Sequence, residues 1–277
     1  MKSEDHDALR RDDTAEAHFS QYATPLIDNA LHCAAALRAD PDAEVLHKLR
    51  VSLRRLRSLL WAYRPLLDER FDEQQRALFK YFAGAAGKTR DWDILIALLD
   101  ETGDARAQPH EALQASREQA FETSRETLEQ ANVKAALRDA LKEANQRLNT
   151  AHDRTSLPRF ARKRLGSAQK SMKKRMRRAA HAPRSDYASY HDVRKAGKKL
   201  RYLIEFFEPV LPKKQLKATK GLKKLQKRFG ELNDVVASEQ LLREHPDVFS
   251  DEASAGRALD ALAKERKRRM RAAAKLL

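Results

Sequence analysis

A histidine and a row of cations recur twice in this chain, with members three and four residues apart. The first row is His47, Arg50, Arg54 and Arg57, and the second is His191, Arg194, Lys198 and Arg201. Like charges at this helical spacing repel by ~0.2–0.5 kcal/mol per pair. Residues 47–63 contain no acidic residue that would relieve the repulsion. A bound anion would relieve it, so the rows predict an anion-binding surface, although a solvated basic face would look the same in a single helix.

The sequence around each row is repeated at a constant offset. HKLRVSLRRLRSLL begins at His47 and HDVRKAGKKLRYLI begins at His191, which gives 191 − 47 = 144. A second pair, GKTRDWDILIALL from Gly87 and GELNDVVASEQLL from Gly230, gives 230 − 87 = 143. Two matches in the same order predict an internal duplication.

The helices that carry the rows also carry an apolar stripe. In the first, this stripe comprises Leu46, Leu49, Leu53, Leu56, Leu60 and Tyr63. The cations follow the same steps one residue later, which is a rotation of about 100°. We therefore expect each cationic row to border the core and not to lie opposite it.

Composition and punctuation predict an all-α protein. Aromatic residues make up only 6%, and the 277 residues include 8 glycines and 9 prolines. No segment alternates with the period of a strand. Prolines near the ends of periodic segments predict eight helices, four in each repeat, at about residues 15–38, 43–63, 69–101, 109–150, 158–180, 185–208, 212–243 and 251–276. The predicted divisions are a disordered tail at 1–14, a first repeat at 15–153 and a second, basic repeat at 154–277.

Charge is distributed unequally between these repeats. The whole chain carries +16. Residues 1–153 contain 22 Lys/Arg and 27 Asp/Glu, a net −5, and residues 154–277 contain 34 and 13, a net +21. This asymmetry favours a second half that faces a polyanion. Further candidate contacts lie in the acid-free segment 159–182 and on a lysine stripe of the seventh helix: Lys173, Arg177, Lys217, Lys220 and Lys224.

Other chemistries are weakly indicated. The histidines stand among arginines, which would repel a metal ion, so we expect no metal, no cofactor and no catalytic residue. His47 and His191 are expected either to donate to phosphate or to bond a neighbouring helix. Asp91 and Asp234 are expected to orient a cation or histidine, or to cap a helix. Gly197, where the first repeat has Leu53, indicates a close helix approach or a weakened core.

The compartment is indicated only indirectly. One cysteine, Cys33, excludes an internal disulfide and fits a reducing cytoplasm. No apolar run approaches the ~20 residues of a membrane span, and the polar N-terminal segment does not have the features of a signal peptide. We therefore expect a cytoplasmic protein.

The two pairs of repeated segments resemble the CHAD family, the conserved histidine α-helical domain, over about residues 15–277. The resemblance implies two four-helix bundles related by a pseudo-twofold axis. It also implies a basic surface or channel that binds inorganic polyphosphate, and association with polyphosphate granules. Many members are fused to a triphosphate tunnel metalloenzyme domain, which is missing here, so the resemblance implies no hydrolase activity. The motif positions are the eight row residues, and the neighbouring positions Arg55, Arg90, Lys195 and Tyr202 complete the candidate set.

The expected function is noncatalytic polyphosphate binding, and two alternatives remain open. Nucleic-acid backbone binding explains the charge equally well, although few aromatic residues are available for base stacking. A phosphoanhydride hydrolase would need a metal held by carboxylates or an activated nucleophile. Nothing in the sequence resembles a phosphate-binding glycine loop or a nucleophile elbow.

Overall fold

The computed structural model describes residues 13–39, 42–102, 109–150, 154–183, 185–217 and 219–277, without the side chains of residues 214, 217, 219 and 220. These residues form α-helices, short 3-10 turns and connections, with one isolated bridge between Thr14 and Ser156. The all-α class predicted from the sequence is confirmed. The helices are α1 (Ala15–Ala39), α2 (Ala43–Tyr63), α3 (Glu69–Ala85), α4 (Lys88–Thr102), α5 (His110–Gln130), α6 (Val133–Thr150), α7 (Leu157–His181), α8 (Tyr187–Phe207), α9 (Lys213–Lys217), α10 (Thr219–Glu244) and α11 (Glu252–Ala274).

Two of the predicted long helices are interrupted. The helix expected at 69–101 breaks into α3 and α4 at Ala86 and Gly87. The single helix expected at 109–150 is wrong, because α5 ends at Gln130 and Asn132 takes a positive φ of 43° before α6. Asparagine tolerates this conformation better than most residues. The segment expected to be helical at 212–243 contains α9 and α10, and residue 218 between them lies outside the described residues.

Aspartates begin the helices that carry the rows. The side chain of Asp42 accepts a hydrogen bond from the backbone of Glu44, and Asp186 does the same for Ser189 before α8. Such caps satisfy backbone N–H groups that the helix leaves without partners. The beginnings of α2 and α8, and therefore the angular positions of their side chains, are fixed in this way.

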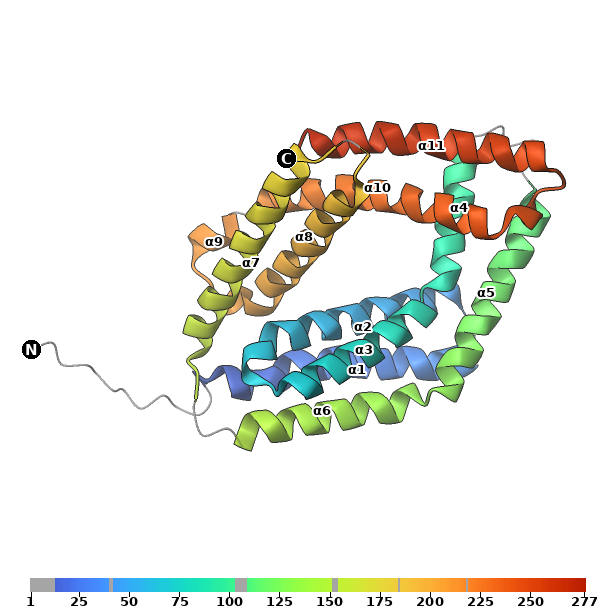
Figure 1. The fold of residues 1–277 in the computed structure, drawn as a ribbon. Helices are drawn as coiled ribbons and strands as arrows, with labels where there is room; N and C mark the ends of the chain where they lie inside the picture. Colours follow the sequence, from blue (N-terminus) through green and yellow to red (C-terminus); the bar gives the residue numbers. More distant parts are fainter. Residues whose placement is uncertain (1–12, 40–41, 103–108, 151–153, 184, 218) are drawn as a thin grey trace, which may run out of the picture.

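The two predicted repeats interlock and do not form separate bundles. In Figure 1, α4 crosses to the helices of the second repeat, where it packs on α10 and α11. One apolar core joins α1, α2, α3 and α6 to α7, α8 and part of α10. The other core joins α4 and α5 to the remaining part of α10 and to α11. Both cores therefore draw on both sides of the boundary predicted at residues 153/154.

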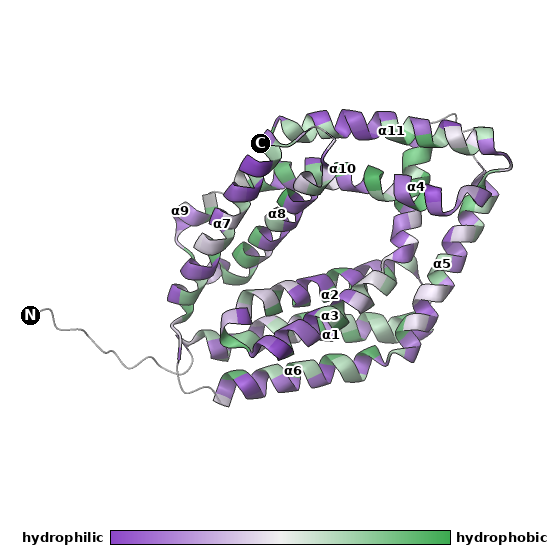
Figure 2. Cartoon of the chain, in the orientation of Figure 1, coloured by the Kyte–Doolittle hydropathy of each residue, from purple (hydrophilic) through white to green (hydrophobic). Residues whose placement is uncertain are grey.

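An aromatic group connects the two row-bearing helices. The buried Tyr63 ring, at the end of α2, lies 5.0 Å from Phe19, 5.2 Å from Phe160 and 6.3 Å from Phe207 at the end of α8. Figure 2 shows hydrophilic and hydrophobic residues along both helices. Their apolar stripes are buried, as the periodicity predicted.

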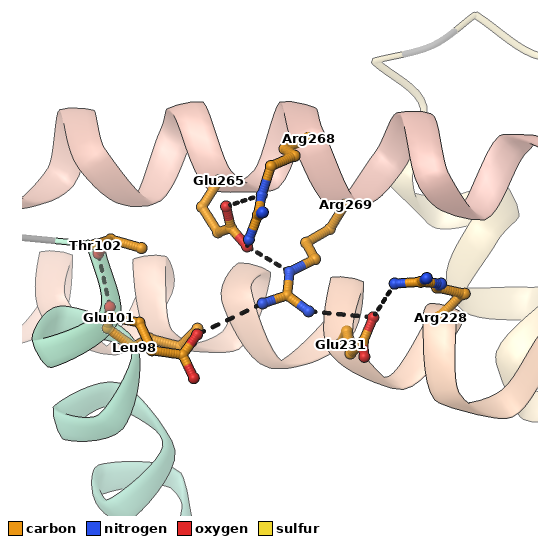
Figure 3. Close-up of polar contacts among 8 residues, drawn as sticks. All are labelled: Leu98, Glu101, Thr102, Arg228, Glu231, Glu265, Arg268 and Arg269. Atoms are coloured by element: carbon orange, nitrogen blue, oxygen red, sulfur yellow. Dashed lines mark hydrogen bonds and ion pairs between the residues drawn. The ribbon is translucent and has the colours of Figure 1, made fainter.

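Ion pairs fix α11 against α10 and α4. Arg269 of α11 reaches Glu231 of α10 at 3.1 Å and Glu101 of α4 at 3.6 Å, and it also contacts Glu265 of its own helix (Figure 3). Because Glu265 is buried, its charge is retained through Arg268 and Arg269, which hold the pKa of its carboxyl below the usual range. Much of the basic C-terminal segment is therefore neutralised within the fold.

Candidate functional site

The two cationic rows face one another. Helix α2 packs against α8, and all eight row residues are half-buried. Arg54 of α2 lies close enough to Arg201 of α8 for their charges to interact, and Lys198 of α8 interacts with both Arg50 and Arg54 of α2. The sequence left open whether the rows converge or face separate directions; in the structure they converge into one cluster. We call Arg50, Arg54, Arg194, Lys198 and Arg201 the central basic cluster.

Positive charge in this cluster is poorly compensated. Burial and then the charges of Arg54 and Arg194 lower the pKa of Lys198 to about 6. Burial also lowers the pKa of Arg54 and that of Arg194. Asp234 of α10 is the carboxylate that opposes all three shifts, and no described carboxylate lies within ion-pair distance of Arg54, Arg194 or Lys198. Buried charges normally have partners, so this cluster is suited to receive an anion.

Arg50 is held in place by the turn between α3 and α4. Its guanidinium donates to the carbonyl oxygen of Gly87 at 2.7 Å and to Asp91 Oδ1 at 3.3 Å. A Cβ at Gly87 would lie 1.8 Å from an Arg50 nitrogen, so the glycine is needed for this approach. Burial raises the pKa of Asp91, and Arg50 opposes that shift. Asp91 therefore orients a cation, which is one of the two roles expected from the sequence.

His191 is bonded to a neighbouring helix. Its Nδ1 lies 3.2 Å from Asn233 Oδ1 of α10 and 3.2 Å from the Tyr187 hydroxyl, which donates to the same Asn233 oxygen at 3.0 Å. Burial, with Lys195 and Arg194, lowers the pKa of His191. The imidazole is therefore neutral near pH 7, with Nδ1 facing a structural partner. Of its two expected roles, the structure supports the bond to a neighbouring helix.

The first repeat does not reproduce this arrangement. Arg90, at the position of Asn233, is exposed and lies 3.6 Å from Asp93. His47 Nδ1 is buried without a hydrogen-bond partner among the described residues. Asn233 supplies the acceptor that fixes His191 in the second repeat. Arg90 occupies the corresponding position in the first repeat and offers no such acceptor to His47.

One carboxylate links the far ends of the rows. Glu205 lies 3.1 Å from Arg201 within α8 and 3.7 Å from Arg55 of α2. The Arg201 guanidinium also lies 4.9 Å from the centre of the buried Tyr202 ring. One edge of the central basic cluster therefore has partly compensated charge. This edge is formed by Arg55, Arg201 and Tyr202.

The remaining candidates lie on other faces or outside the description. Lys195 is paired with Asp192 at 3.0 Å. Lys173 and Arg177 are exposed on α7, and Lys224 is exposed on α10. Lys217 and Lys220 have side chains outside the described residues. No hydrogen bond or ion pair among the described residues joins Lys173, Arg177 or Lys224 to the central basic cluster, so their predicted role stays a prediction.

Gly197 permits a close approach between α8 and α10. A Cβ at this position would lie 3.2 Å from a Leu225 methyl, and the Gln226 side chain donates to the Gly197 carbonyl at 3.0 Å. The close-approach interpretation of this glycine is confirmed. The contact places Asn233 and Asp234, further along α10, beside the row of α8.

Sequence reasoning missed a second group of cations around Trp61. The Arg164 guanidinium and the Lys199 ammonium each lie 4.7 Å from the centre of the Trp61 ring. Arg164 also donates to the Trp61 carbonyl at 2.6 Å. The sequence did offer one signal for this group. Lys199 directly follows Lys198, so it must lie on a different face of the same helix.

The described residues contain neither a metal-ligand cluster nor a membrane-spanning helix. No group of three or more histidine, cysteine, aspartate or glutamate side chains there is arranged to hold a metal ion. None of the described helices has the length and apolar content to cross a bilayer.

An all-α fold in which two histidine-bearing basic helices meet defines the class of protein. The CHAD domain family model matches residues 21–243, and the chain belongs to this family. The comparison with curated proteins gave no match. The crystal structure of the CHAD domain from the plant Ricinus communis is similar over 98% of this chain and 95% of that one, with 25% identity and a TM-score of 0.74.

PptA from Streptomyces chartreusis shares the fold. Its structure covers 95% of this chain and 97% of its own, with 16% identity and a TM-score of 0.67.

Proposed function

We propose that this protein binds inorganic polyphosphate without cleaving it, and that the central basic cluster is the binding site. The main support is that two helices from different parts of the sequence bring Arg54, Arg194 and Lys198 together. Asp234 is the carboxylate that opposes the lowering of their pKa values. A polyanion would supply the missing negative charge. Association with polyphosphate granules is part of the same proposal.

The ligand is inferred from the form of the cluster and from the family. CHAD proteins are associated with polyphosphate. Polyphosphate is a linear series of negative charges without bases or sugars, and a row of arginines and lysines matches that regularity. Arginine can bind two phosphate oxygens at once, whereas lysine acts as a compact charge. The described cluster offers one buried aromatic side chain, Tyr202, which is already covered by Arg201, so base stacking is not favoured.

The proposed role is binding and not hydrolysis. Asp91 is bonded to Arg50 and Glu205 is paired with Arg201. His191 directs Nδ1 to Asn233. None of these three groups is free to activate a nucleophile through the atoms named. Incubation of the protein with long-chain polyphosphate and Mg²⁺ should leave the chain length unchanged. Release of orthophosphate that disappears in the His191→Ala variant would contradict a noncatalytic role.

The binding site is tested with neutral substitutions on both helices. The Arg54→Gln, Arg194→Gln double variant should bind long-chain polyphosphate at least about 100-fold more weakly, because two charge-assisted contacts are worth about 1.5–3 kcal/mol each. The matched control is Lys134→Gln with Arg138→Gln, two exposed cations on α6. The control should bind like the parent protein. Equal losses in the two double variants would mean that charge is used diffusely and that no defined site exists.

Competition separates polyphosphate from nucleic acid. We expect long-chain polyphosphate to displace bound RNA or DNA at low stoichiometry, and nucleic acid to fail in the reverse experiment at moderate salt. Displacement of polyphosphate by RNA at equal concentrations of phosphate groups would favour nucleic-acid backbone binding instead.

A further inference from the structure

A second group of cations lies on another face of α8. Asp192, Lys195 and Lys199 each follow a row residue by one position, a rotation of about 100° around the helix. They line a cavity of about 230 Å³ together with two alanines, Ser171 and Arg175 of α7, and Trp61 of α2. The cavity therefore lies where α2, α7 and α8 meet, on a different face of α8 from the central basic cluster.

The cavity carries more positive than negative charge. Lys195 Nζ lies 3.0 Å from Asp192 Oδ1, and this is the ion pair described among the lining residues. Arg175 donates to the hydroxyl and carbonyl oxygens of Ser171, on its own helix. Three cations therefore face one carboxylate.

Lys199 is the least compensated of these cations. It is half-buried, its ammonium lies over the Trp61 ring, and no described carboxylate lies within 4.0 Å of it. Burial, followed by the charges of Arg76, Arg175, Lys195 and Arg57, lowers its pKa to about 8. The ring face returns to the cation only part of what the ammonium loses on partial removal from water. An anion in the cavity would complete the interaction.

We propose that this cavity binds a phosphate dianion, either free orthophosphate or the terminal phosphate of a small phosphate compound. The cavity, of about 230 Å³, has room for a phosphoryl group. Arg175 would supply a planar pair of donors, Lys195 and Lys199 would supply point charges, and the Ser171 hydroxyl would supply a neutral donor.

This inference does not depend on polyphosphate binding at the central basic cluster. Lys199 and Arg175 belong to the cavity, whereas Arg54 and Arg194 belong to the cluster. The two sites can therefore be removed separately, and failure of one proposal leaves the other intact.

The test uses Trp61 as a reporter. The chain has two tryptophans, so Trp92→Phe leaves Trp61 as the one tryptophan beside the cavity. In this background we expect orthophosphate to cause a saturable change in tryptophan emission, because Lys199 would move from the ring to the anion. Calorimetry on the unsubstituted protein should give the same dissociation constant. Emission that does not saturate with orthophosphate or tripolyphosphate, together with no heat of binding, would overturn the proposal.

Variants locate the binding. Lys199→Met keeps the aliphatic stem over Trp61 but removes the charge, and Arg175→Met does the same on α7. Each should weaken calorimetric phosphate affinity by about tenfold or more, the effect of losing one charge-assisted contact. Lys170→Met, an exposed cation on α7, is the control and should bind normally, as should the Arg54→Gln, Arg194→Gln variant. Unchanged affinity in both cavity variants, or loss in the cluster variant instead, would overturn the assignment.

Two ligands distinguish the sources of the phosphate group. Equal affinities for orthophosphate and tripolyphosphate would identify a site for the free anion. A tighter complex with tripolyphosphate that remains sensitive to Lys199→Met would identify a site for a chain end. Both outcomes support a site for a phosphate dianion. Sulfate and chloride that bind as tightly as orthophosphate would contradict it.

Discussion

At the scale of single residues, Lys198 shows how binding and stability oppose one another. Its ammonium faces Arg50 and Arg54 from α2, Arg194 from its own helix and Asp234 from α10. The pKa of about 6 in the folded protein lies below the value of about 10.4 expected for an unfolded lysine. Folding therefore releases a proton between these pH values, and the destabilising contribution of Lys198 grows as pH falls from 10.4 towards 6.

Lys198→Met should consequently make the protein more stable and a poorer receptor. We expect the free energy of unfolding at pH 7 to rise by about 1–2 kcal/mol, the scale of typical stabilising substitutions, in chemical denaturation. Lys134→Met, at an exposed position, should leave it within about 0.5 kcal/mol. A destabilised Lys198→Met protein would show that the lysine is paired in solution.

The same residue gives polyphosphate affinity a pH dependence. Bound phosphate favours the charged ammonium, so binding at pH 8 takes up a proton, and affinity should increase as pH falls from 8 to 6. Calorimetry in buffers of different ionisation enthalpy measures the proton uptake. An uptake that is unchanged by Lys198→Met would refute this assignment.

At the scale of elements, the turn between α3 and α4 positions the first row. Gly87 allows the Arg50 guanidinium to bond its carbonyl and Asp91. In the second repeat, Gly230 lies within α10 and has open space around its Cβ position. The same glycine in the two repeated motifs therefore has a packing role in one repeat only, a difference that the aligned sequences do not reveal.

Gly87→Ala should displace Arg50, because the added Cβ would overlap its guanidinium. We expect a loss of about 1 kcal/mol in the free energy of unfolding, since a part-buried hydrogen bond from a flexible side chain is disrupted, and weaker polyphosphate binding. Gly84→Ala, three residues earlier in α3 with nothing within 4 Å, is the matched control and should be neutral or slightly stabilising. Equal stability of the two variants would show that Arg50 does not need this turn.

Much of the element structure could be predicted from periodicity and helix ends. The apolar stripe of α2, the adjacent cations and the orienting role of Asp91 follow from spacing and residue type. The sequence could not predict that Arg54 meets Lys198, because that contact depends on how α2 packs on α8. Lys195 was grouped with the candidates beside the row, although its partner Asp192 stands three residues earlier in α8 and this spacing was available in the sequence.

At the scale of the whole molecule, the repeats depend on one another. Trp92, Leu95 and Leu99 of α4 are buried in a core shared with α10 and α11, so a chain cut at residue 153 would expose them. Fragments 15–153 and 154–277, expressed separately, should show no cooperative thermal transition by circular dichroism. The full chain should unfold in one transition. A cooperative transition in either isolated fragment would contradict this mutual dependence.

The duplication itself stays a prediction. Helices α2 and α8 occupy comparable places, because α2 packs beside α1 and α3, and α8 packs beside α7 and α10. The sites within them differ: His191 is fixed by Asn233, and Arg50 is fixed by Gly87 and Asp91. The two halves therefore contribute unlike side-chain environments to the central basic cluster.

The salt dependence of long-chain polyphosphate affinity tests most directly whether α2 and α8 form one site. Each phosphate contact releases counterions, so affinity should fall linearly on logarithmic axes as salt increases. Removing one contacting cation should reduce the slope by about one. Arg54→Gln and Arg194→Gln should each do so, and the double variant should lose about two. A slope that these variants leave at the parent value, or that Lys134→Gln with Arg138→Gln lowers equally, would contradict the shared site.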